Sequence, residues 1–258
     1  MDLAFRDRFT DRWHRYFGAE ELPLTFHYTD REDGPPPVEP VKERRCLLAE
    51  LARARGGEPL RFGADSFGCP GGRRYAGFDE RLRPDFEYFL SCGIPGRMEG
   101  ERYKKSPEIV RDLLARAPAF RAPARFLVVK RWDTLEAGDE PEVAAFFARP
   151  DALAGLFTLA GFPSADDLVV APFGAGCSTI IQRPFLERDR ESPRAVLGMF
   201  DVSARPHVPA ETLCFSVPIS LLRRMTDDMD ESFLITDSWE KVRRRLRPAA
   251  RSRAPEVA

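Results

Sequence analysis

The chain has 258 residues, a hydrophobic content of 43%, a charged content of 31% and a formal net charge of −1. A nearly neutral chain of this composition has no global attraction for nucleic acid or for an anionic membrane. No apolar run approaches the roughly 20 residues of a membrane-spanning helix, and the charged segment Met1–Arg8 does not resemble a signal peptide. We therefore expect a cytoplasmic protein that binds neither nucleic acid nor membranes.

Apolar periodicity predicts helices and strands that alternate along the chain, the first of them a helix with aromatic residues at every fourth position, Phe5, Phe9, Trp13 and Phe17. The predicted helices span residues 3–17, 41–55, 84–91, 107–115, 151–159, 177–182, 219–225 and 237–246, and a further short helix is expected to begin at Cys69. The predicted strands span residues 24–28, 125–129, 143–147, 195–200 and 213–217, with shorter apolar runs at 59–62 and 168–172. Residues 30–40, which contain three consecutive prolines, are expected to form an exposed loop.

These elements show no internal repeat. Interleaved strands and helices favour one α+β or α/β domain over residues 1–247, with a mixed sheet flanked by helices. Residues 248–258 are rich in arginine, alanine and proline and are predicted to be a disordered tail.

The five cysteines are the residues most able to carry chemistry. Their number is odd and their spacing is wide, so we expect free thiols in a reducing compartment and no disulfide framework. They are Cys46, Cys69, Cys92, Cys177 and Cys214.

Two of these cysteines share a local setting. Cys69 and Cys177 each follow a short apolar run and a turn containing glycine, and each opens a predicted helix. A helix N-terminus presents free N–H groups and partial positive charge, which favours the thiolate that binds metals and attacks electrophiles. The neighbouring glycines are expected to contact a bound cofactor; they are Gly71, Gly72, Gly174 and Gly176.

The other cysteines differ in their expected exposure. A helix over residues 41–55 would place Cys46 on the face opposite Leu47, Leu48 and Leu51, where a partner could face it. Cys214 alternates with its apolar neighbours along a strand, so it is expected on the less apolar side, whereas Cys92 is interpreted as a packing residue.

Familiar catalytic and metal-binding motifs are missing from the sequence. There is no Cys-x-x-Cys, no histidine pair at helical spacing and no phosphate-binding Gly-Lys-Ser/Thr. The polar stretch 99–105 contains Arg102 and Tyr103, which could contact an anion, although such a run is more often only solvated. Three or four scattered cysteines could still converge on a soft metal or an iron–sulfur cluster.

Several blocks taken in order resemble a prokaryotic family of unknown function, domain of unknown function 169, also called ArCR. The blocks are Arg45-Cys46, Cys69-Pro70-Gly71-Gly72, Gly93-Ile94-Pro95-Gly96, Glu99-Gly100-Glu101-Arg102-Tyr103-Lys104, Gly176-Cys177 and Phe215-Ser216-Val217-Pro218. The resemblance implies that Cys46, Cys69 and Cys177 belong to the family pattern and that Cys92 departs from it. It implies no activity.

Three hypotheses remain open from the sequence. The leading one is a binding or redox accessory protein in which Cys46, Cys69 and Cys177, with Cys214 as a fourth contributor, hold a soft metal or iron–sulfur cluster. The second is a thiol enzyme with Cys69 or Cys177 as nucleophile, although no histidine partner is evident. The third is a protein that binds a small ligand or another protein and whose cysteines only pack.

Overall fold

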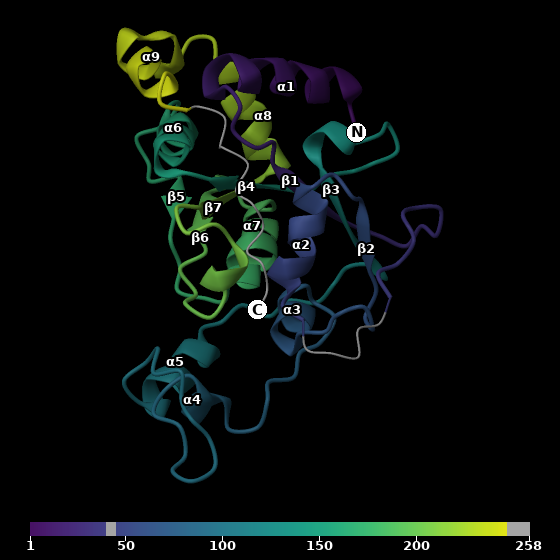
Figure 1. Ribbon diagram of the computed structural model, residues 1–258, viewed down its shortest axis with the longest axis vertical. Coiled ribbons are helices and arrows are strands. Elements are labelled where there is room, and N and C mark those ends of the chain that lie inside the picture. Colours follow the sequence, from purple (N-terminus) through teal and green to yellow (C-terminus); the bar gives the residue numbers. More distant parts are fainter. Residues whose placement is uncertain (40–44, 247–258) are drawn as a thin grey trace, which may run out of the picture.

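A computed structural model describes residues 1–39 and 45–246 of the chain (Figure 1). Its centre is a seven-stranded sheet in the order β2 (Leu60–Phe62), β3 (Phe126–Arg131), β1 (Leu24–Thr29), β4 (Val143–Ala148), β7 (Leu213–Pro218), β6 (Ala195–Gly198) and β5 (Val169–Val170). Neighbouring strands are antiparallel except for β5 and β6, which are parallel. Helices pack on both faces, so the fold is α+β with a mixed sheet, as predicted.

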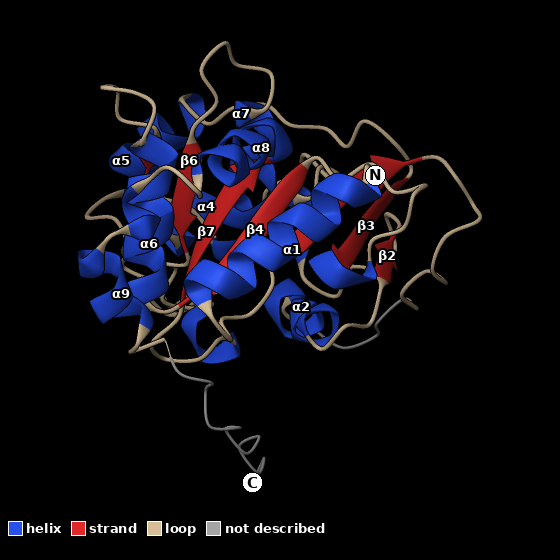
Figure 2. Ribbon diagram, turned by 90° about the horizontal axis from the view of Figure 1, so that it is seen from above, coloured by secondary structure: helices blue, strands red, loops and turns tan. Residues whose placement is uncertain are grey.

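One face of the sheet carries an aromatic core. It is covered by α1 (Leu3–Phe17), α6 (Pro150–Gly161), α8 (Ile219–Asp228) and α9 (Asp237–Arg243). Figure 2 shows α1 lying across the strands. The four-residue aromatic spacing of α1 is confirmed: the Trp13 and Phe17 rings stack 4.3 Å apart, and Phe9 packs on Trp132. The 3₁₀ turns Trp132–Thr134 and Phe233–Ile235 close this side.

The second core lies under α2 (Leu47–Arg55), α3 (Pro70–Tyr75), the π-helical turn η2 (Ser178–Gln182) and α7 (Arg183–Glu187). It buries Phe26, Leu51 and Ile181 against the sheet. A 3₁₀ turn, Arg205–His207, follows β6. This is the face that carries the functional candidates, because Cys46, Cys69 and Cys177 precede α2, α3 and η2.

Two glycines allow these three helix starts to lie close together. A Cβ on Gly72 would lie 2.9 Å from the Cβ of Leu47, so α3 can lie this close to the start of α2 only with glycine there. A Cβ on Gly176 would lie 2.9 Å from the Met199 sulfur and 3.1 Å from Leu48. We name the segments 46–48, 69–72 and 174–178 the cysteine turns.

Residues 79–119 leave the sheet and form a projection that we call the arm, at the lower end of Figure 1. It contains the short helices α4 (Phe86–Phe89) and α5 (Pro107–Ala115). The backbone N–H of Ala122 donates to the Gly77 carbonyl at 2.8 Å, which closes the base of the arm. Val110 is fully buried within it.

Some predicted boundaries are wrong. The helix expected over residues 41–55 begins at Leu47; residues 40–44 lie outside the described part, and Cys46 is the N-cap, not a residue on a helical face. The helix after Cys177 does not stop before Pro184, which occupies the first turn of α7, where a missing N–H costs nothing. The last helix is capped by Thr236 and ends at Arg243, and the predicted tail lies outside the described residues.

A buried histidine on β1 makes the stability of this fold depend on pH. His27 is 7% exposed, and within the described residues its Nδ1 has no hydrogen-bond partner. Burial lowers the pKa of His27, opposed by Asp139 and reinforced by Lys130. The folded protein therefore prefers neutral His27, whereas the unfolded chain takes up the proton near pH 6.5.

We predict that the free energy of unfolding falls as the pH drops below about 6.5, because protonation of His27 favours the unfolded chain. His27→Gln should remove part of this fall. Urea denaturation of both proteins between about pH 7.5 and about pH 5.5 tests this. Parallel pH profiles for the two proteins would contradict it.

We also predict that Gly72→Ala destabilises the protein by about 1–3 kcal/mol, the usual cost of overpacking. The matched control is Gly161→Ala at the end of α6, where an added Cβ would meet nothing within 4 Å. That change should be neutral or stabilise by about 0.5–1 kcal/mol, because alanine is the better helix former. Urea denaturation curves give both values; equal effects at the two positions would contradict the close packing of α3 on α2.

Candidate functional site

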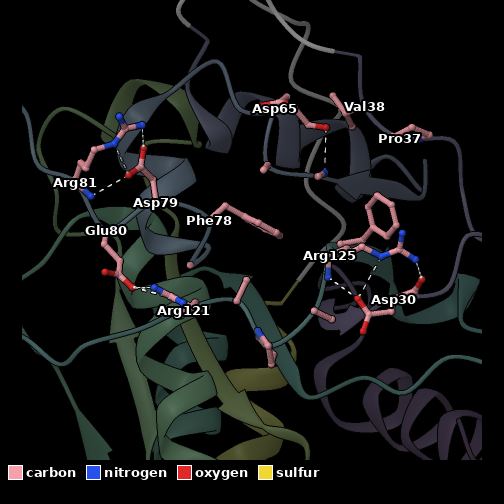
Figure 3. Close-up of a pocket in the computed structure, with 18 of the residues that line it drawn as sticks. Asp30, Pro37, Val38, Asp65, Phe78, Asp79, Glu80, Arg81, Arg121 and Arg125 are labelled. Atoms are coloured by element: carbon pink, nitrogen blue, oxygen red, sulfur yellow. Dashed lines mark hydrogen bonds and ion pairs between the residues drawn. The ribbon is translucent and has the colours of Figure 1, made fainter.

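Two cavities lie beside the arm, and the first has its charges already paired. It measures about 1060 Å³ and lies next to β2 (Figure 3). Each of its three arginines has a carboxylate partner: Arg81 pairs with Asp79, Arg121 with Glu80, and Arg125 with Asp30 and Glu32. This pairing leaves no free arginine to recognise a ligand.

The second cavity measures about 1170 Å³ and lies between the arm and the cysteine turns. Cys46, Cys69 and Cys177 all line it, although they are far apart in sequence. Ligand cavities typically hold about 300–1,000 Å³, so this space could take more than a metal ion. We call it the arm cavity and treat it as the candidate site.

Cys46 and Cys69 occupy the N-cap positions of α2 and α3, and both are partly exposed. The Sγ of Cys69 accepts a hydrogen bond from the Gly72 N–H at 3.4 Å. Burial raises the pKa of Cys46, and the backbone N–H groups of Leu48 and Ala49 oppose that rise. The helix start therefore favours the Cys46 thiolate, which was not predicted, but burial outweighs it.

Cys177 is the deepest of the three thiols. It is 9% exposed, at the start of η2. Burial raises its pKa well above the usual thiol value, and the charges of Cys69 and Cys46 raise it further. The expectation that a helix start would lower the pKa of this thiol is therefore wrong, because desolvation dominates.

The remaining cysteines lie elsewhere. Cys214 is fully buried in the second core, its Sγ lies 3.3 Å from the Ser216 hydroxyl, and burial raises its pKa to about 12. It does face away from Phe215 and Val217, but that side of β7 is also covered, so it does not line the arm cavity. Cys92 is exposed on the arm and is not the packing residue that was predicted.

Of the glycine and polar residues predicted to contact a cofactor, some line the arm cavity and others do not. Gly71, Gly174, Gly176 and Tyr103 line the cavity, whereas Gly72 and Arg102 do not. Gly72 packs against Leu47, as described above. Arg102 adopts a left-handed backbone conformation with φ of 55°, and its N–H donates to the Ser91 carbonyl at 3.0 Å.

Tyr103 connects the arm to the turn that carries Cys177. Its hydroxyl accepts from the Ser203 N–H at 2.9 Å and donates to the Asp201 carboxylate at 3.4 Å. The other Asp201 oxygen accepts from the Gly176 N–H at 3.1 Å. We call this chain of hydrogen bonds the arm latch. It holds the arm over the cysteine turns.

Sequence reasoning missed several residues of this site. Asp201 follows a short strand without any motif, and Phe173 and Phe200 read as ordinary apolar residues until the structure shows them 44% and 53% exposed on the cavity wall. Only the Gly-Glu-Arg-Tyr-Lys block pointed toward Tyr103. Among the described residues of the wall there is no histidine that could act as an imidazole base for the cysteines.

The donor chemistry of the cavity suits a soft metal, but its geometry is not that of an assembled metal site. Within residues 1–39 and 45–246, no three His, Cys, Asp or Glu side chains are grouped as they would be around a metal ion.

Across the same residues, every helix falls short of the length and apolarity that a bilayer crossing demands.

Comparison with known proteins identifies the family and no more. The sequence profile of DUF169, described as uncharacterised ArCR, matches residues 15–228. No curated protein and no solved structure is significantly similar to the chain. The matched region is well over half of the chain and holds the three cysteine turns and the arm. The chain therefore belongs to the DUF169 family, which its motifs resemble.

Proposed function

We propose that this chain is a binding protein whose arm cavity holds a soft metal ion or an iron–sulfur cluster, with Cys46, Cys69 and Cys177 as ligands. One observation carries the proposal: three thiols from separate segments line the same cavity. Thiolates are the side chains that soft metals and iron–sulfur clusters select. Cys214 is left out because it lies inside the second core.

The raised pKa values count against a free nucleophile in this cavity. Burial raises the pKa of Cys46 and Cys177, and neighbouring thiolates add to the rise for Cys177. A nucleophile must be a thiolate near neutral pH, and nothing in the cavity wall supplies a histidine to deprotonate it. A bound cation deprotonates its thiol ligands outright and cancels the repulsion between them.

Backbone N–H groups would support such a centre. The Gly72 N–H already donates to the Cys69 sulfur. The backbone N–H groups of Leu48 and Ala49 lower the pKa of Cys46. Hydrogen bonds to cluster sulfurs are among the means by which proteins tune these centres. The three side chains are not grouped around one point, so binding requires them to turn toward a common centre.

We predict that protein purified without oxygen contains metal, and that Cys46→Ser, Cys69→Ser and Cys177→Ser each lose it. Adding metal to the wild type should raise the free energy of unfolding by about 2.7 kcal/mol at about 100 times the dissociation constant. Elemental analysis, sulfide analysis and thermal melts of the apo and loaded forms provide the measurement.

Cys92→Ser is the matched control, because Cys92 is exposed on the arm and does not line the cavity. This variant should keep both the metal and its effect on stability. Wild-type protein without metal or sulfide, whose melting does not change when ferrous iron and sulfide are supplied, would contradict the proposal and leave the cysteines as packing residues.

A further inference from the structure

The arm cavity is larger than a metal centre requires, and apolar side chains of the arm line part of it. Phe86 and Phe89 of α4 and Leu113 and Leu114 of α5 line it. None of the four belongs to either core of the described chain. The arm therefore turns apolar side chains toward the cavity without burying them in protein.

The body presents apolar side chains to the same space. Phe173 and Phe200 are 44% and 53% exposed, and Val202 is 69% exposed; all three line the cavity. Single exposed apolar residues are ordinary on a protein surface, but apolar groups that line two sides of one cavity are typical of a ligand site. The occupant of this part therefore has an apolar body.

Three arginines of the cavity wall have no carboxylate partner within the described residues: Arg74 donates to the Glu80 carbonyl, Arg83 lies over the Phe89 ring, and Arg183 makes no such contact. Within the described residues, no carboxylate lies within ion-pair distance of Arg183, and its Nε is shielded from solvent without a hydrogen bond. The neighbouring cavity arginines Arg81 and Arg97 pair with Asp79 and Asp85. An unpaired guanidinium in a cavity wall favours an anionic ligand, because charge-assisted hydrogen bonds are the strong ones.

We propose that the arm cavity binds a small organic anion, whose apolar body lies between α4, α5 and Phe200 and whose charged group pairs with Arg183. The inference rests on the proposed function only in placing the ligand site in this cavity. It requires no metal there, and the cavity of about 1170 Å³ has room for both.

Two fluorescent probes of the same ring system test this. One is 8-anilinonaphthalene-1-sulfonate, an aromatic anion, and the other is N-phenyl-1-naphthylamine, which lacks the sulfonate. The wild type should bind the anion at least about tenfold more tightly, as expected for a charge-assisted hydrogen bond. Arg183→Gln should remove this preference, and Arg183→Lys should restore part of it.

The controls separate the cavity from the rest of the surface. Arg116→Gln, at an exposed arginine that pairs with Asp112 outside the cavity, should leave both affinities unchanged. Phe200→Ala should weaken both probes by about tenfold, since each loses an aromatic contact. Circular dichroism confirms folding, and a partly unfolded variant would bind both probes more strongly instead.

Equal affinity of the wild type for the two probes would overturn the proposal. A preference that survives Arg183→Gln, or affinities that do not fall in Phe200→Ala, would also overturn it, because the probe would then bind elsewhere. If Cys69→Ser loses metal and keeps the probe preference, the two proposals both hold. Wild-type protein that lacks metal but prefers the anion would sustain this inference and defeat the metal proposal.

Discussion

The close approach of two glycine-containing turns to the start of α2 determines where the functional candidates lie. Gly72 packs on Leu47, and Gly176 packs on Leu48 and Met199. These contacts bring Cys46, Cys69 and Cys177 to one cavity, although 131 residues separate the first from the last. Larger side chains at these glycines would push the turns apart.

The arm completes the site that these contacts begin. Tyr103 reaches Asp201 and Ser203, and Asp201 in turn accepts from the Gly176 backbone. The same hydrogen bonds therefore position the arm and the Cys177 turn. Arg102 adopts a left-handed backbone conformation directly before Tyr103, whose hydroxyl makes these contacts with the body.

Local sequence patterns predicted much of the fold. The aromatic residues of α1 recur every four positions, and this period gave both ends of the helix correctly. The start of α2 was predicted too early, because Arg45 is a good helix former and the residue types before Leu47 carry no helix-stop signal. Pro184 was taken as a helix end, although proline is also compatible with a first turn.

The candidate site was predictable only in part. The cysteines at predicted helix starts, with their glycines, identify in the sequence the turns that line the cavity. Their pKa values follow from burial, which depends on neighbours distant in the chain and cannot be read from the turns themselves. No local motif marks Phe173, Phe200 or Arg183 in the sequence. They can be recognised as cavity residues only once the arm is seen beside them in the fold.

The central claim is that the three thiols can share one ligand. Cadmium, a soft metal, tests it directly when added to protein freed of any native centre. X-ray absorption at the cadmium edge counts the sulfur atoms bound to the metal. The account predicts one cadmium per chain with three sulfur neighbours, reduced to two by Cys69→Ser and unchanged by Cys92→Ser. Cadmium bound by a single sulfur, or not bound at all, would contradict it.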